Sequence, residues 1–168
     1  MKIIRESIKD QLAKRFFLFL PPKEAVHYEK AGEAWKLILD KFPSAKKDAE
    51  EADKCFALGL DNACVFHCMK VMEYGIRSLG ATLKSPKLDP KRNPTWGEIL
   101  RPCDNELTKP KLKRIPEWAN KEQFFAEATA NLRSVKEAWR DPIMHVKKDY
   151  GHDESENVLR TVRTFMGH

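Results

Sequence analysis

Long hydrophobic runs are missing from this chain of 168 residues, which also contains only seven glycines. The longest stretch of large apolar residues is FFLFL, residues 16–20, whereas a membrane-spanning helix needs about 20 apolar residues in succession. The segment before it carries too many charges for a secretory signal peptide. The sequence therefore predicts a cytoplasmic protein that makes no contact with a membrane.

Cysteine is also scarce, and its pattern gives no indication of a disulfide scaffold. Cys64 and Cys68 are four residues apart, so they lie on one side of a predicted helix, where two metal ligands would meet. No second Cys or His pair has the spacing of a zinc finger, and the apolar neighbours of these cysteines favour packing in the core. Phosphate-binding glycine loops, carboxylate clusters for two metals and Ser or Cys triads are not recognisable either. We therefore expect no metal and no cofactor.

The formal net charge is +6, and the basic excess is concentrated between residues 84 and 114, which carry nine basic and four acidic side chains. An excess of this kind favours an anionic partner, nucleic acid first, and the alternative is a pair of solvated loops. Trp96 and Trp118 flank the basic segments and are expected to anchor them on the protein, with stacking on bases as the alternative. The candidate RNA-binding residues are Lys84, Lys87, Lys91, Arg92, Lys109, Lys111, Lys113 and Arg114.

Apolar residues recur at helical spacing over most of the chain, and no segment sustains the alternation of a β-strand. With 42% hydrophobic and 33% charged residues, the chain is long and apolar enough to form one folded domain. We therefore predict an all-α protein, an antiparallel up-and-down helical bundle. The predicted helices span residues 3–17, 23–41, 45–58 and 61–81, a short segment from Thr95, the segment from Asn120 to about Asp141, and a last segment from Asp153.

Two N-cap signatures mark helix starts in the second half of the chain. Residues 95–98, TWGE, have the spacing of a capping box, and residues 120–123, NKEQ, have a similar pattern. The second of these helices is predicted to bury one apolar stripe, formed by Phe124, Ala128, Leu132, Val135 and Trp139. It is expected to end near Asp141, because Asp141 can cap a new turn that has Pro142 at its first position.

The predicted helix 61–81 is apolar almost all round, which is typical of a helix in the middle of a bundle or at a dimer interface. Its few polar residues follow one another at steps of three or four and therefore share one face. This polar stripe consists of His67, Lys70, Glu73 and Arg77. The interpretation that we favour is a solvent-facing stripe. The alternative is that it faces Arg140 and His145 across a cleft and supplies further ionisable groups.

Arg140 and His145 lie five residues apart in WRDPIMHV, residues 139–146, around the expected helix break. Such a break exposes side chains and backbone N–H groups, and both suit a phosphate. A neutral imidazole can take the proton of a ribose 2′-OH, and an imidazolium can protonate the leaving 5′-oxygen. A guanidinium can stabilise the negative charge of the phosphorane. The structural alternative is that Arg140 binds carbonyls at a helix C-terminus and that His145 is an interface residue.

Three stretches together resemble the HEPN-domain superfamily. They are ACVFHCMKVMEYGIRSLG (63–80), AWRDPIMHV (138–146) and YGHDESENVLRTVRTFM (150–166). The motif of that superfamily is an arginine, a polar residue and then a histidine after a gap of four to six residues, and Arg140, Asp141 and His145 fit it. The resemblance covers residues 44–168, which we expect to form a HEPN-like helical domain. Residues 1–43 are expected to form a helical extension packed on the bundle, so that the whole chain is one globular unit.

The resemblance implies a helical bundle that is often a symmetric dimer, with one composite site where two motifs meet. Active members are metal-independent endoribonucleases of toxin–antitoxin, phage-defence and RNA-processing systems. Arg140 would then stabilise charge and His145 would act as acid or base. Asp141 would orient one of them or cap the helix, and we favour the cap. Other members of the superfamily are silent modules that bind nucleic acid or a partner. The expected partners are therefore RNA, a second copy of the chain and an antitoxin or regulatory protein.

Overall fold

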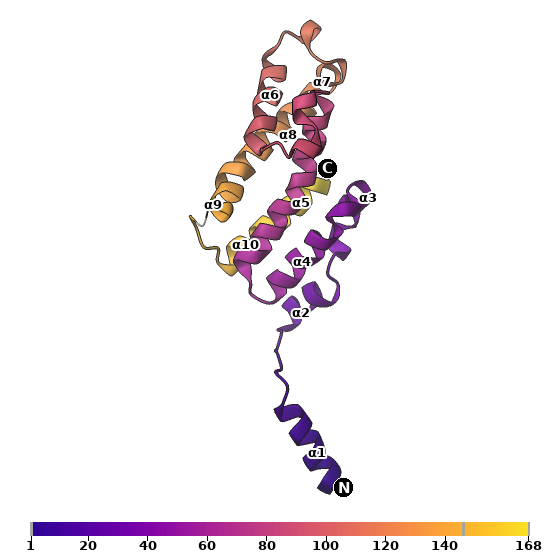
Figure 1. The fold of residues 1–168 in the computed structure, drawn as a ribbon, viewed down its shortest axis with the longest axis vertical. Helices are drawn as coiled ribbons and strands as arrows, with labels where there is room; N and C mark the ends of the chain where they lie inside the picture. Colours follow the sequence, from indigo (N-terminus) through magenta and orange to yellow (C-terminus); the bar gives the residue numbers. More distant parts are fainter. Residues whose placement is uncertain (1, 146, 168) are drawn as a thin grey trace.

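The helix α5 (Asp61–Thr82) runs through the centre of the protein, shown as a ribbon in Figure 1. In this computed structural model, which describes residues 2–145 and 147–167, α4 (Lys46–Ala57) and α10 (His152–Gly167) pack along α5. The central position follows from the sequence of α5, because its apolar residues lie on most sides of the helix. Its buried residues are Cys64, Val65, Cys68, Met69, Val71, Met72, Ile76, Leu79 and Gly80.

The described residues form helices and turns with no β-strand, so the prediction of an all-α helical bundle is confirmed. The other α-helices are α1 (Lys2–Ala13), α2 (Pro22–Glu29), α3 (Lys36–Lys41), α6 (Trp96–Thr108), α7 (Pro116–Asn120), α8 (Glu122–Val135) and α9 (Asp141–Met144). Short 3₁₀ turns are η1 (Glu33–Trp35), η2 (Pro43–Ala45), η3 (Pro86–Leu88), η4 (Pro90–Arg92) and η5 (Lys111–Lys113). A π-helical segment, η6 (Lys136–Arg140), joins α8 to α9. No described helix is long and apolar enough to cross a membrane.

The prediction of one helix over residues 23–41 is wrong, because the chain leaves α2 after Glu29 and turns at Gly32. Gly32 has a φ of +89°, a conformation that is strained for residues with a side chain. Its N–H donates to Oδ2 of Asp53 at 2.9 Å, and Nε1 of Trp35 donates to Oδ1 of Asp53 at 3.1 Å. A buried carboxylate on α4 therefore determines where the predicted helix breaks.

The two N-cap predictions have different outcomes. Thr95 and Glu98 form both hydrogen bonds of a capping box at the start of α6, as predicted. The prediction of an N-cap at Asn120 is wrong, because Asn120 ends the short helix α7 and Lys121 precedes α8 without a side-chain cap. The buried stripe of α8 also differs from the predicted one at its first position, because Phe125 is buried and Phe124 is exposed.

The tryptophans that flank the basic segments and the four cysteines all lie in the core. Trp96 and Trp118 are buried, with Trp118 stacked on Phe125 at a ring distance of 4.1 Å, so both tryptophans anchor the basic segments on the bundle. The four cysteines are buried and free, which confirms the prediction of a core position for Cys64 and Cys68. Burial raises the pKa of the Cys103 thiol to about 12, so this thiol remains protonated at neutral pH.

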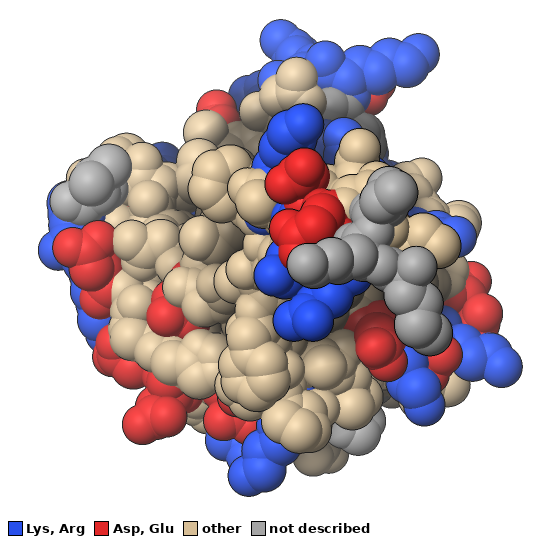
Figure 2. Space-filling view, turned by 90° about the horizontal axis from the view of Figure 1, so that it is seen from below, with Lys and Arg blue, Asp and Glu red and all other residues tan. Residues whose placement is uncertain are grey.

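The first 43 residues divide into two parts. Residues 22–42 lie against the bundle, where Trp35 and Ile38 are buried and α2 packs on α4. In contrast, α1 projects away from the bundle in Figure 1, and residues 4–19 are exposed along their whole length. Figure 2, which is seen from below Figure 1, shows acidic and basic side chains interspersed over this end of the protein.

Candidate functional site

The expected helix break at Arg140 and Asp141 does not occur, and the chain continues from α8 through the π-helical segment into α9. Pro142 explains the change of helix type. It has no N–H for the carbonyl of Ala138, four residues earlier, and its ring crowds that carbonyl. The N–H of Asp141 accordingly bonds to the carbonyl of Lys136, five residues back. Widened helical turns of this kind are frequent at functional sites.

Tyr150 compensates for the N–H that Pro142 lacks. Its hydroxyl donates toward the carbonyl oxygens of Ala138 and Trp139, at 3.3 and 3.4 Å. Burial raises the pKa of Tyr150, so the hydroxyl keeps the proton that it donates. The backbone of Tyr150 is held in turn by Asn62 on α5, whose Oδ1 accepts the Tyr150 N–H at 2.8 Å. The loop before α10 is therefore attached both to the widened helix and to α5.

Replacing Tyr150 by phenylalanine should lower the free energy of unfolding by about 1 kcal/mol, because carbonyls at the π-helical segment lose a buried donor. Urea unfolding followed by circular dichroism measures the change. Tyr28→Phe is the matched control, since Tyr28 is exposed and its substitution should change stability by less than about 0.5 kcal/mol. Equal stability of Tyr150→Phe and wild type would contradict this role of the hydroxyl.

Asp141 lies between two cations and does not serve as the predicted cap. One carboxylate oxygen accepts a hydrogen bond from Nζ of Lys136, and the other accepts one from Nη1 of Arg140 at 3.1 Å. The side chains of Lys136, Arg140 and Asp141 are all half-buried, and no side-chain capping bond precedes α9. Partial burial raises the pKa of Asp141, but the hydrogen bonds from Lys136 and Arg140 outweigh it, so the pKa lies below its ordinary value. The cluster therefore carries two positive charges and one negative charge at neutral pH.

The lowered pKa of Asp141 predicts a pH-dependent contribution to stability. The contribution is fully present above about pH 4, the ordinary range of an aspartate, and is lost as the pH falls through the lowered pKa. We expect Asp141→Asn to be less stable than wild type at pH 7, and the difference to shrink toward pH 2. Urea unfolding at a series of pH values measures it. A difference that stays constant over this range would show that the ion pairs of Asp141 do not stabilise the fold.

His145 follows α9 directly and has an exposed side chain. Its backbone N–H donates to the carbonyl of Asp141 at 3.1 Å, which closes the last turn. Arg140 and His145 thus lie at the two ends of one four-residue helix, with Arg140 half-buried. This arrangement places a guanidinium and an accessible imidazole at the two ends of one short helix, with Lys136 in the preceding turn.

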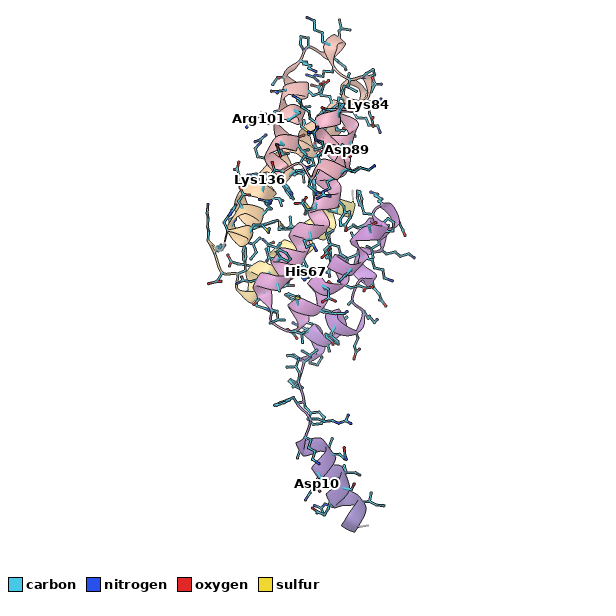
Figure 3. All side chains as sticks on the ribbon, in the orientation of Figure 1. Asp10, His67, Lys84, Asp89, Arg101 and Lys136 are labelled. Carbon is cyan, nitrogen blue, oxygen red and sulfur yellow. The ribbon has the colours of Figure 1, made fainter. Side chains whose placement is uncertain are left out.

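The polar stripe of α5 is positioned by α4 and α6. Oδ1 of Asp48, on α4, lies 3.0 Å from Nδ1 of His67 and 3.1 Å from Nζ of Lys70. Glu73 accepts a hydrogen bond from Nε1 of Trp96 at 2.5 Å and pairs with the Arg77 guanidinium at 3.6 Å. Among the hydrogen bonds and ion pairs of the described residues, none joins this stripe to Arg140 or His145. Figure 3 labels His67 on α5 and Lys136 on the neighbouring helical segment.

The basic segments lie at the end of the bundle opposite to α1, where Figure 3 labels Lys84. Seven of the eight candidate RNA-binding residues are exposed, namely Lys84, Lys87, Lys91, Arg92, Lys109, Lys111 and Lys113. Arg114 differs, because it is half-buried and donates to the carbonyls of Lys109 and Leu107 at 2.8 and 2.6 Å. Arg114 therefore holds the second basic segment in place. We name the seven exposed residues the basic tip.

Two residues of this region were not found by sequence reasoning. Lys136 lies five residues before Asp141, a spacing that brings the two together only because the helix is widened there. Tyr150 lies twelve residues after Ala138, so short-range patterns give no signal for its contact. Pro142, three residues after the last residue of the predicted apolar stripe, is the one sequence feature that indicates an irregular helix here.

Comparison with known proteins assigns no function to this chain, so the proposal below is based on the geometry of the candidate site. No family model, no curated protein and no solved structure matches this chain. Among the described residues, no three His, Cys, Asp or Glu side chains are grouped so that they could hold a metal ion. The features that define the candidate site are therefore the Lys136–Asp141–Arg140 cluster, the exposed His145 and the distant basic tip.

Proposed function

We propose that this protein is a metal-independent endoribonuclease of HEPN type, cytoplasmic and related to a toxin or defence system. The observation that carries the proposal is the pairing of a half-buried Arg140, held by Asp141, with an exposed His145 on the same short turn. These are the two groups that metal-free cleavage of RNA uses, a fixed positive charge and an imidazole that can act as a general acid or base.

The proposed reaction begins when the neutral imidazole of His145 takes the proton of a ribose 2′-OH. The 2′-oxygen attacks the adjacent phosphorus, and Arg140 stabilises the charge that gathers on the phosphorane oxygens. The bond to the 5′-oxygen then breaks, and an imidazolium protonates that leaving oxygen. In a homodimer the His145 of the second copy supplies this proton. The products are a 2′,3′-cyclic phosphate and a 5′-hydroxyl.

Asp141 positions Arg140 in this scheme. Its carboxylate engages Nη1 of Arg140, while a guanidinium has five N–H donors, so the carboxylate fixes the orientation and other donors remain for a phosphate oxygen. Lys136 balances the negative charge of Asp141, so the cluster keeps a net positive charge toward an anionic substrate. We infer that Asp141 does not exchange protons in the reaction, because its lowered pKa keeps it ionised.

The basic tip is the proposed contact surface for the RNA backbone. Its exposed lysines and arginine suit phosphates, which carry most of the affinity in nucleic-acid binding. The helix α8 leads from this end toward the Arg140 turn, and its 14 residues span about 21 Å. A substrate that reaches both surfaces is therefore longer than a dinucleotide, and a folded RNA or an extended strand fits better.

The second candidate function is a catalytically silent, dimeric helical module that binds nucleic acid, a nucleotide or a partner protein such as an antitoxin. The observation that favours it is the separation between the basic tip and His145, since a binding surface at the tip needs no histidine. Both candidates predict RNA binding that weakens steeply with salt, so binding alone does not distinguish them.

Cleavage in the presence of EDTA distinguishes the two candidates. The purified protein is incubated with total RNA and with a set of tRNAs, and the fragments are separated on denaturing gels. The endoribonuclease predicts discrete fragments that appear with time and persist in EDTA. RNA that is bound but remains intact at every protein concentration would favour the silent module.

A further inference from the structure

An elongated groove lies between α8 and α10, and α5 lines one part of it. It consists of two adjoining hollows of about 350 and 570 Å³, and both are lined by Asn131 and Phe165. Along α8 the hollows extend from Lys121 to Ala138, a distance of about 25 Å at 1.5 Å per residue. We name this feature the α8–α10 groove. Its length is that of a helix of about four turns.

The floor of the α8–α10 groove is mainly apolar and its rim is charged. Side chains of the floor come from three helices and include Leu79, Phe125, Leu132 and Met166. Glu117 and Glu127 lie on the rim near α7 and α8. An apolar floor with a polar rim is the form in which proteins receive an amphipathic helix, through residues spaced by three or four positions.

The helix α1 has the matching pattern. Ile4, Ile8 and Leu12 follow one another at steps of four and are 65%, 53% and 47% exposed, so one apolar stripe of α1 has no cover. At 12 residues, α1 is about 18 Å long and fits within the groove. The exposed residues Phe16, Phe17, Leu18 and Phe19 continue the apolar surface beyond the helix. We name residues 4–19 the N-terminal arm.

The lining of the α8–α10 groove carries charges of both signs, because Lys41, Lys121 and Arg160 lie along it together with Glu117 and Glu127. Arg5 and Lys9 lie along one side of the apolar stripe at about 100° per residue, so they border one edge of any surface that the stripe covers. The rim offers Glu117 and Glu127 as partners of opposite charge. Binding of the arm to a membrane surface would leave the groove without a role. Docking of α1 in the groove covers both the apolar stripe of the arm and the apolar floor of the groove.

The direction of the chain favours a second copy of the protein over the arm's own bundle. Pro21 is extended, with φ −57° and ψ 152°, and Pro22 begins α2 directly after it. A residue that precedes proline is also restricted to extended conformations. Residues 14–20, KRFFLFL, contain none of the glycine, asparagine or aspartate that a chain reversal prefers. The arm accordingly points outward, as Figure 1 shows.

The apolar area of the arm is sufficient for a dimer. A buried phenylalanine removes about 150–250 Å² from water. Each arm has three phenylalanines, so two arms together bury about 900–1,500 Å² before the groove surface is counted. Stable interfaces bury about 1,200–2,000 Å² in total. An exchange of arms between two copies reaches this size and is symmetric, which closes the assembly at two chains.

We propose that the N-terminal arm of each copy docks in the α8–α10 groove of a second copy, with Ile4, Ile8 and Leu12 on the groove floor. This exchange of arms goes beyond RNA cleavage and does not depend on it. The α8–α10 groove is then a self-association surface. In the dimer, α1 of one copy contacts both α8 and α10 of the other.

Sedimentation equilibrium of the full chain tests the exchange. The wild type is expected at the dimer mass, and Ile8→Asp with Leu12→Asp is expected at the monomer mass, because two charges enter the apolar stripe. Ser7→Asp with Ala13→Asp is the matched control, since it adds the same charges away from the stripe and should remain dimeric. Ala128→Arg fills the groove from the other side and should also give monomers, with unchanged helicity by circular dichroism.

Cysteine cross-linking separates the occupants of the groove. Leu12→Cys on one tagged chain and Asn131→Cys on a differently tagged chain should form a disulfide between the two copies after mixing. A wild-type monomer, or a dimer that survives both the arm and the groove variants, would overturn the proposal. A double variant that cross-links only within one chain would overturn it as well, by placing the arm in its own groove. None of these readouts involves RNA, so they are independent of the proposed activity.

Discussion

Replacing Asp53 by alanine is expected to lower the free energy of unfolding by about 3–5 kcal/mol, one of the largest effects of any single substitution in this chain. Asp53 is 1% exposed and accepts hydrogen bonds from the Gly32 N–H, from Trp35 Nε1 and from the Arg163 guanidinium. Without the carboxylate, Arg163 stays largely buried with no opposite charge, and two further donors lose their acceptor. The melting temperature should fall by roughly 6–20 °C.

A double-mutant cycle shows whether the Asp53–Arg163 pair causes this loss. Arg163 contacts Asp53 and lies over the Trp35 ring at 5.1 Å, so its truncation alone should also destabilise the protein. If the pair is responsible, Asp53→Ala combined with Arg163→Met should cost less than the sum of the single changes, because the double variant leaves no unpaired buried charge. A cost of less than about 1 kcal/mol for Asp53→Ala would contradict the assigned role.

The second large effect is expected on RNA cleavage. His145→Ala should reduce the rate by about 10²–10⁴-fold, the usual contribution of a general acid or base. Arg140→Ala should reduce it by about 10²–10³-fold, as expected for the loss of a donor that stabilises the transition state. Lys147→Ala is the matched control, because Lys147 is an exposed cation two residues beyond His145. Its rate should change by no more than a few fold.

A conservative replacement of Arg140 and the pH dependence of the wild-type rate test the two assigned roles separately. Arg140→Lys should restore little of the lost activity, since an ammonium lacks the planar fork of donors of a guanidinium. The wild-type rate should follow a bell-shaped pH profile, with one limb for the base and one for the acid. Equal losses in His145→Ala and Lys147→Ala would assign the effect to lost positive charge and contradict acid–base catalysis.

Local patterns predicted much of the fold. The apolar run of residues 61–81 indicated a central helix, and the structure places α5 between α4 and α10. Thr95 and Glu98 cap α6 through contacts over three residues, which a sequence pattern captures directly. Trp96, Trp118, Cys64 and Cys68 are buried, as predicted, whereas Trp139 of the predicted apolar stripe is only partly buried.

The wrong predictions arise where a distant residue decides a local conformation. The break at Gly32 depends on Asp53, which lies 21 residues later, so a helical pattern over residues 23–41 does not reveal it. The continuous passage through Pro142 depends on the Tyr150 hydroxyl, which lies on the loop before α10. In both places a tertiary hydrogen bond overrides the local preference of the chain.

The residues of the candidate site could be predicted from the sequence, whereas the residues that contact them could not. Arg140, Asp141 and His145 were chosen by spacing, whereas the contact of Lys136 with Asp141 arises from the widened helix. The polar stripe was identified as one face of a helix, but its partners Asp48 and Trp96 come from other helices. Spacing predicts which residues share a helix face, and only the packing of helices determines what that face contacts.

The chemical nature of the RNA ends is the measurement that tests the central claim most directly. Wild-type protein and His145→Ala are incubated with a labelled tRNA in EDTA, and the fragments are examined by mass spectrometry. Attack by the 2′-OH predicts a 2′,3′-cyclic phosphate and a 5′-hydroxyl with the wild type, and no new ends with His145→Ala. Fragments with a 3′-hydroxyl and a 5′-phosphate, or cyclic phosphate ends formed equally by both proteins, would contradict cleavage by Arg140 and His145.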